Sequence, residues 1–320
     1  MTFYDGLALL NDNLLAHVTS PNKRLFWGYI IATLAIVFVV SSRHKKNTSF
    51  LKYVLDKRIW LHRSAVHDYV IFIINIVIKT LIITPFLFAV APIAIWVSFG
   101  LENIFGELPA VVTNKTGVAV LFTVMLFLMD DLTRFLLHLA LHKIPVLWAF
   151  HKVHHSAQVL TPVTVYRIHP VESALYAIRL LLVNGLVLGL GFYLFSYQLR
   201  VIDILGANMF IFAFNVLGAN LRHSHVWFSW PKTIEKWFIS PAQHQVHHSR
   251  AFIHRDKNFG TTLAIWDRMT HSLVCSHECS KPIIFGVRDK KINQSVVTLY
   301  FKPIGDFATV LVNIFKRPTK

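Results

Sequence analysis

The chain has 320 residues, of which 54% are hydrophobic, and it carries a formal net charge of +16 with only two cysteines. A mean hydropathy of +0.51 excludes an ordinary soluble domain, and two cysteines exclude a disulfide framework. Basic residues in the cytoplasmic loops of a membrane protein explain the positive charge more simply than nucleic-acid binding does.

Five apolar segments are long enough to span a membrane, which requires about 18 to 25 residues; the second is longer than that and is broken by Pro85 and Pro92. In chain order they are Leu25–Ser42, Tyr69 to about Ser98, about Gly117 to Leu141, Ala174–Phe195 and Val201–Gly218. We therefore predict an all-α integral membrane protein with about four to five transmembrane helices. The spacing of Gly185 and Gly189 within the fourth span predicts a close-packing face for another helix.

The loops between these segments differ in charge. Residues 43–67 carry seven basic residues against Asp56, whereas residues 99–116 carry only Lys115 against Glu102 and Glu107. The positive-inside rule places the first loop in the cytoplasm and the second outside. Spans four and five then form a hairpin, so the segments before and after it share the cytoplasmic face.

Histidines gather between residues 138 and 248 in short groups. The groups are HLALH from His138, HKVHHS from His151, RIHPVE around His169, RHSH from His223 and HQVHHS from His244. Imidazole is the commonest side-chain metal ligand and suits iron, copper, nickel and zinc. Positions three or four apart share one helix face, so each main group offers two or three nitrogens to one point. The predicted hairpin would let the two HxxHHS copies meet in a cytoplasmic helical cap.

The number and type of these side chains predict two metal ions. Four ligands saturate a zinc ion, and nine or ten histidines exceed that number. Few carboxylates accompany them, which argues against a soluble di-iron bundle and against calcium or magnesium. Two iron ions, which can activate O2, fit best. Asp131, Arg134, His138 and His142 form one helical stripe, so Asp131 either accepts a hydrogen bond from a ligand imidazole or pairs with arginine.

At these residues the chain resembles the fatty acid hydroxylase/sterol desaturase superfamily of membrane di-iron oxygenases, whose boxes run HxxxH, HxxHH and HxxHH. The resemblance covers about residues 125–272 and includes LWAFHKVHHSA, RIHPVE, RHSH and KNFGTTLAIWDR. It implies these iron ligands: His138, His142, His151, His154, His155, His244, His247 and His248. It further implies that His169 and His223 are ligands or ligand supports. Asp131, Asn258 and Asp267 match positions for which we expect a supporting role.

Three departures from the family pattern concern the choice of lipid. Leu139 stands where an arginine is usual, His225 replaces an asparagine found in many relatives, and MTHS follows WDR in place of FGT. His225 therefore receives no ligand role. These changes leave the metal ligands intact.

The resemblance implies O2-dependent hydroxylation or desaturation of an alkyl or acyl chain, with no catalytic residue beyond the metal centre. The glycines of the fourth span lack the strand–turn–helix context of a dinucleotide site, and no cysteine set could hold an iron–sulfur cluster. An external reductase, ferredoxin or cytochrome must then supply electrons. We expect a multi-pass protein of a bacterial inner membrane, or of the endoplasmic reticulum in a eukaryote.

Two other functions fit part of the pattern. A histidine-rich metal transporter or sensor would place its ligands near the bilayer midplane along a path, and a metal-dependent lipid hydrolase would keep zinc and need no reductant. We divide the chain into a membrane-anchoring region with two spans (1–115), a catalytic domain (116–290) and an interfacial tail (291–320). Lys302, Pro303 and Asp306 interrupt the tail, which favours an amphipathic segment over a sixth span.

Overall fold

The computed structural model describes residues 3–43, 49–80, 89–112, 114–196, 199–205, 207–279, 282–289 and 291–316. These residues form helices and one antiparallel pair of two-residue strands, β1 (Asp203–Ile204) and β2 (Ala207–Asn208). The α-helices are α1 (Phe3–Thr19), α2 (Trp27–Arg43), α3 (Phe50–Val54), α4 (Lys57–Trp60), α5 (Arg63–Ile78), α6 (Val90–Phe105), α7 (Lys115–Lys143), α8 (Pro145–His155), α9 (Pro170–Phe195), α10 (Met209–Val216), α11 (Lys232–Glu235), α12 (Pro241–His247), α13 (Ile265–Met269) and α14 (Val296–Lys316). The predicted helical class is confirmed.

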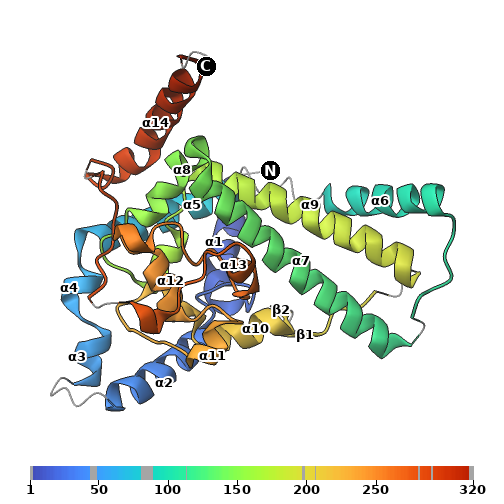
Figure 1. Cartoon of the computed structure of the whole chain (residues 1–320), viewed down its shortest axis with the longest axis horizontal. Helices are drawn as coiled ribbons and strands as arrows, with labels where there is room; N and C mark the ends of the chain where they lie inside the picture. The colour runs from blue at the N-terminus through green and yellow to red at the C-terminus, as the bar shows by residue number, and fades with distance from the viewer. Residues whose placement is uncertain are drawn as a thin grey trace.

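Helices α6, α7 and α9 form a lobe that projects from the rest of the chain (Figure 1). Helix α6 lies along α9, where a Cβ atom added to Gly185 would come within 2.5 Å of Ile93 Cγ2. A Cβ atom on Gly189 would come within 2.5 Å of the Ala94 carbonyl oxygen. The predicted small-residue packing face is therefore confirmed, because only glycine permits this approach of the two backbones.

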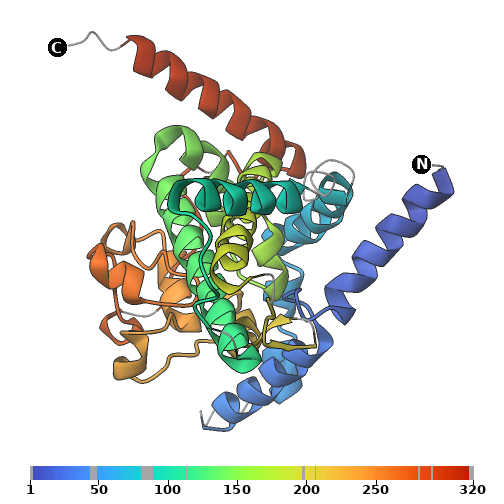
Figure 2. The same cartoon turned by 90° about the vertical axis from the view of Figure 1, so that its right-hand side faces the viewer.

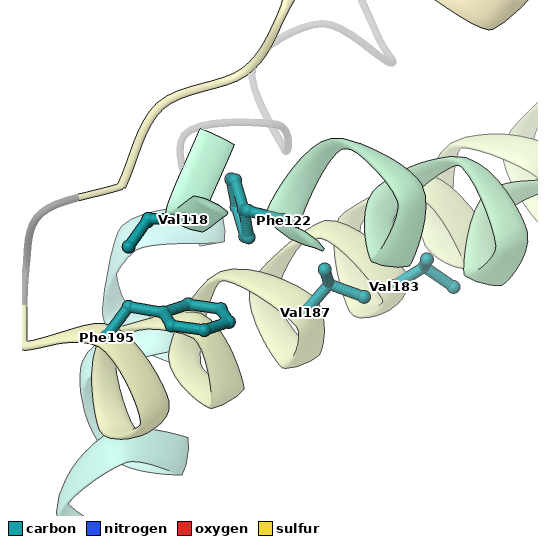
Figure 3. Packing of buried hydrophobic residues seen from close by; sticks show 5 residues of the cluster. All are labelled: Val118, Phe122, Val183, Val187 and Phe195. Carbon is teal, nitrogen blue, oxygen red and sulfur yellow. The ribbon is translucent and has the colours of Figure 1, made fainter. Parts of the chain in front are cut away.

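The interface between α7 and α9 is filled by large apolar side chains. Figure 3 shows Val118 and Phe122 of α7 facing Val183, Val187 and Phe195 of α9. All five are buried. Their packing holds together the two long helices that lead toward the histidines.

The predicted spans correspond only in part to single helices. Among the described residues, α9 is the one helix that is long and apolar enough to cross a membrane. The segment 50–78 would add a second only if its two parts, bent by 81°, formed one broken span. Helices α2 and α6 are apolar but shorter, and the predicted span 69–98 falls in α5 and α6, with residues 81–88 outside the described residues. The number of membrane crossings and the membrane face remain predictions.

The fifth predicted span is wrong, and with it the two-span hairpin. Residues 201–218 contain β1, β2 and the eight-residue helix α10. Eight helical residues extend about 12 Å, well short of the roughly 30 Å hydrocarbon core. After α9 the chain instead returns along α7, where the Ile202 N–H donates to Thr123 Oγ1 at 2.8 Å. The two histidine boxes nevertheless meet.

Helix α14 reaches outward from the body as a single helix (Figures 1 and 2). Its first turns pack near α8, where Leu299 joins a buried cluster with Ile71, Val153 and Ile292. Val297, Phe301 and Phe315 remain more than 60% exposed. This pattern agrees with an amphipathic helix, while its placement at a membrane interface remains a prediction.

Candidate metal centre

Three helix ends and one 3₁₀ turn bring the histidines together. They come from the C-terminal turns of α7, from helix α8, from the 3₁₀ turn η4 (Ala219–His223) and from helix α12. Pro145 and Pro241 occupy the first turns of α8 and α12, where a missing N–H costs no helical hydrogen bond. Ser240 and Gln243 also form a capping box that fixes the start of α12. Both HxxHHS copies therefore begin from well-defined helix starts.

Nine histidines form two groups in which one ring nitrogen of each residue lies within 4.8 Å of the others. The five-histidine group is His138, His142, His151, His155 and His247. The four-histidine group is His154, His223, His244 and His248. Each HxxHHS copy is divided between the groups, so both metal positions would require both copies.

The four-histidine group has nearly equal spacings between its Nε2 atoms. His223 Nε2 lies 3.2 Å from His154, 3.1 Å from His244 and 3.1 Å from His248. The Nε2 atoms of His244 and His248 are 3.2 Å apart. Four nitrogens bound tetrahedrally at about 2.0 Å would be separated by roughly 3.3 Å. The spacing therefore suits a single cation.

Backbone carbonyls determine the tautomers of three of these histidines. His138 Nδ1 donates to the Phe259 carbonyl at 2.7 Å, and His247 Nδ1 donates to the Lys257 carbonyl at 2.7 Å. His154 Nδ1 donates to the carbonyl of Arg167 at 3.3 Å. A carbonyl can only accept, so Nδ1 carries the proton and Nε2 presents a lone pair to its group.

His151 follows the same pattern with a carboxylate. Its Nδ1 lies 2.9 Å from Glu172 Oε1, and both side chains are at most 3% exposed. The Nε2 atoms of His151 and His247 are buried with no hydrogen-bond partner. Buried lone pairs that lack a donor and face other lone pairs are costly unless a cation lies between them. The residues present therefore fit a metal ion.

Burial keeps these imidazoles in the form that binds metals. It lowers the pKa of His151 and of His154 to about 3. Burial, followed by the charges of neighbouring histidines, holds the pKa of His223, His244 and His248 well below 6.5. At neutral pH these rings are uncharged, as metal ligation requires.

Asn258 and Asp267 hold the loop whose carbonyls orient His138 and His247. Asp267 accepts hydrogen bonds from the Phe259 and Gly260 N–H groups at 2.8 and 2.7 Å. Asn258, at φ +57°, donates to the Gln243 and Val274 carbonyls. Both residues thus position backbone atoms to which the clustered histidines His138 and His247 bond.

Asp131 has a different role from the one expected. Its carboxylate accepts from the Thr262 and Leu263 N–H groups and from Trp266 Nε1, at 2.9 to 3.1 Å, in place of an imidazole. The predicted bond to a ligand histidine is therefore wrong. Arg134 pairs at 2.7 Å with Asp130, the neighbour of Asp131 in the chain. Asp130 and Asp131 are adjacent and both buried, but they lie on different faces of α7 and therefore bond to different partners.

His169 lies outside both groups, in contrast to its predicted place as a ligand. It caps the N-terminus of α9, where its Nδ1 accepts from the Val171 N–H at 3.2 Å. Its Nε2 lies 2.9 Å from the Tyr300 carbonyl. Both ring nitrogens are therefore engaged elsewhere. His223, by contrast, lies at the centre of the four-histidine group.

Two further residues of the site, Glu172 and Arg167, were not predicted from the sequence; they flank His169 in the stretch YRIHPVE. Glu172 is 2% exposed and Arg167 is fully buried. The available signal was an acid in the first turn of an otherwise apolar helix, where a buried charge needs a partner. His225, which received no ligand role, contacts the Tyr53 carbonyl through Nε2 at 2.8 Å.

Comparison with known proteins agrees with this geometry. Residues 123–272 match the family model for fatty acid hydroxylase. Alkylglycerol monooxygenase from Caenorhabditis elegans is 24% identical over 191 residues, which cover 60% of this chain and 33% of that protein. The chain thus spans about a third of that relative's length, and no solved structure gives a significant match. The matched segment contains all nine clustered histidines, and the match identifies residues 123–272 as a fatty acid hydroxylase domain.

Proposed function

We propose that the chain is a membrane di-iron oxygenase that uses O2 to hydroxylate, or to desaturate, an alkyl or acyl chain of a lipid. The observation that carries the proposal is the convergence of buried histidines into one group of five and one group of four. The fatty acid hydroxylase match over residues 123–272 and the monooxygenase relative support oxidation of a lipid.

In this proposal the five-histidine group holds one iron ion and the four-histidine group holds the other. When bound, the irons supply the redox chemistry that activates O2 toward an unactivated C–H bond, which amino-acid side chains cannot supply. The protein's own contribution is orientation. Glu172 and the carbonyls of Arg167, Lys257 and Phe259 keep the Nδ1 protons in place, which raises the basicity of the ligating nitrogens.

The donor set supports iron over zinc. Within the described residues, both groups consist only of histidine nitrogens. Five donors exceed the four of a tetrahedral structural zinc site, whereas imidazole ligands also suit redox-active iron. Eight of the nine histidines are buried, so the protein excludes bulk water from the centre.

The long apolar helices support a substrate drawn from the bilayer. Helix α9 is a candidate membrane span, and it begins two residues before Glu172 of the histidine centre. A lipid chain could then approach along the α7 and α9 lobe, while a cytoplasmic reductase, ferredoxin or cytochrome delivers electrons at the other side. Ether lipids such as alkylglycerols join fatty acyl and sterol lipids as substrate classes to test, because the relative is named for an alkylglycerol.

A metal transporter or sensor is the rival function. Transport requires release of the ion, whereas the Nδ1 bonds to buried carbonyl and carboxylate acceptors favour a resident metal. Transport of metal by purified protein, without O2 consumption, would support the rival.

The decisive experiment compares metal content and lipid products of purified wild-type protein, His247→Ala and His277→Ala. His277 is exposed and lies outside both groups, so it serves as the control. The iron-loaded protein is supplied with O2, a reductant and membrane lipids, and lipid extracts are searched for the gain of one oxygen or the loss of two hydrogens. We expect His247→Ala to lose metal and product, and retention of both would refute the proposal.

A further inference from the structure

A buried ion pair outside the histidine groups supports one of the HxxHHS copies. Arg167 Nη1 lies 2.7 Å from Asp68 Oδ1, and both side chains are 0% exposed. Asp68 belongs to α5, and its other oxygen accepts from Thr164 Oγ1 at 2.6 Å. A fully buried guanidinium requires such neutralisation and several acceptors, because desolvation of an unpaired charge is very costly.

The remaining donors of Arg167 bind the end of the first HxxHHS copy. Arg167 Nε donates to the Val153 carbonyl at 2.9 Å, and Nη2 donates to Ser156 Oγ at 2.8 Å. Nη2 also reaches Asn293 Oδ1 at 2.7 Å. The planar fork of arginine is suited to bridging several acceptors in fixed directions, which a lysine ammonium cannot do in the same geometry.

The backbone of Arg167 acts directly on a candidate ligand. Its carbonyl accepts from His154 Nδ1, and His154 Nε2 lies 3.2 Å from His223 Nε2 in the four-histidine group. His151 of the same copy belongs to the five-histidine group and relies on Glu172 instead. Loss of the Arg167 contacts should therefore affect the four-histidine position first.

Helix α5 also holds the backbone on either side of Arg167. Asn75 Nδ2 donates to the carbonyls of Tyr166 and Ile168 at 3.3 and 2.7 Å. Just after the first HxxHHS copy, the Gln158 N–H donates to Ser64 Oγ of α5 at 3.1 Å. Asp68 lies before the family-matched segment 123–272, and Asn293 lies after it. The support for the histidine box thus comes from both flanks of that segment.

We propose that Arg167, neutralised by Asp68 of α5, is a positioning residue for the four-histidine metal position. The inference rests on the proposed metal-binding function. It assigns to α5, expected from sequence only to anchor the chain, a part in building the metal centre.

The test uses two matched pairs of variants in the full-length protein. Arg167→Lys is paired with Arg179→Lys, because Arg179 forms a comparable buried ion pair with Asp130 at 2.8 Å between α7 and α9. Ser156→Ala is paired with Ser249→Ala at the equivalent position of the second copy. Ser156 is buried under Arg167, whereas among the described residues Ser249 Oγ bonds only to the nearby Ala251 N–H, from which it accepts.

Metal per chain is measured after anaerobic loading with Fe²⁺, and Co²⁺ titration reports each position through its visible absorption. Folding is monitored by circular dichroism. Wild-type protein should bind about two ions, and Arg167→Lys should bind one of them about 10- to 100-fold more weakly. Ser156→Ala should weaken the same ion by about tenfold, and the two controls should match wild type.

The outcomes separate this inference from the function on which it rests. A wild-type chain that binds no metal would overturn both proposals. If wild type binds two ions, three results would refute the positioning role. In the first, Arg167→Lys and Ser156→Ala bind both ions with normal affinity. In the other two, Arg167→Lys binds both ions equally weakly, or Arg179→Lys binds metal as weakly as Arg167→Lys does. Should Arg167→Lys fail to fold, the comparison of Ser156→Ala with Ser249→Ala decides.

Discussion

The two HxxHHS copies have nearly the same sequence but depend on different parts of the molecule. In the first copy, His151 bonds to Glu172 of α9 and His154 bonds to the carbonyl of Arg167. Lys152 reaches Asp306 of α14. The first copy is therefore supported by helices that follow it in the chain and, through Arg167, by α5, which precedes it.

The second copy is supported mainly by its own surroundings. His247 bonds to the carbonyl of Lys257, and Gln245 donates to the carbonyls of Leu221 and Val226 at 2.8 and 2.9 Å. These partners all lie within the matched segment 123–272. The difference shows that a short motif specifies the candidate ligands, whereas the surrounding fold decides which residues orient them.

The position at which the copies differ illustrates this point. The Lys152 side chain is 13% exposed, and its ammonium pairs with Asp306 and lies 3.8 Å from Asp289. Gln245 is 3% exposed and lies against two carbonyls. A neutral amide satisfies those carbonyls without bringing a charge into the interior.

Acidification should have the largest effect, because it acts on both copies together. Unfolded histidine has a pKa near 6.5, whereas burial lowers the pKa of His151 and His154 to about 3. Below pH 6.5 the unfolded chain therefore binds more protons, and stability falls as the pH drops toward 3. At pH 5 these two residues alone should cost the metal-free protein about 4 kcal/mol. Thermal denaturation at pH 7.5 and pH 5 measures the effect, and equal stability would contradict it.

Gln245→Lys should show the next largest effect and would sharpen the contrast between the copies. It places an ammonium in the buried environment of Gln245, beside two carbonyls and without an acid partner. We expect a loss of about 3 kcal/mol in stability, together with weaker metal binding. Gln158→Lys, at an exposed glutamine near the first copy, is the control. Chemical denaturation of both variants measures the difference, and equal stabilities would show that the position is not constrained.

Glu172→Ala tests the support of the first copy. It leaves His151 Nδ1–H buried without its acceptor, which should cost about 2 kcal/mol in stability. Metal affinity should fall by about 10- to 100-fold. Glu278→Ala serves as the control, because that side chain is 51% exposed. Metal titration monitors the affinity, and unchanged binding in Glu172→Ala would show that His151 needs no carboxylate.

Lys152→Gln makes the two hexapeptides identical and should have the smallest effect. It removes the ion pair to Asp306, but Lys302 remains 2.9 Å from Asp306 and 3.0 Å from Asp289. We expect a stability loss of no more than about 1 kcal/mol and normal metal content. A large loss of metal would show that contact with α14, rather than Arg167 and Glu172, orients the first copy.

Sequence patterns predicted the candidate metal ligands more accurately than they predicted the path of the chain. The repeated spacing of HxxxH and HxxHH placed eight ligand candidates on shared helix faces, and the structure brings all eight together with His223. The predicted second helix of the hairpin failed because hydropathy reports apolar composition and not helix length: residues 201–218 are apolar, yet they form β1, β2 and the eight-residue helix α10. The family-level prediction was confirmed because it rested on several separate motifs.

The sequence by itself determined the helical class, the candidate ligand type and the fatty acid hydroxylase resemblance of residues 123–272, because helix periodicity and imidazole chemistry act over a few residues. Tertiary structure alone decided how the histidines divide into five and four. It also decided that Asp131 binds a loop, that His169 caps a helix, and that Arg167 pairs with Asp68. These outcomes depend on which buried donor contacts which acceptor across the fold. The local sequence around each residue does not indicate a partner that lies far away in the chain.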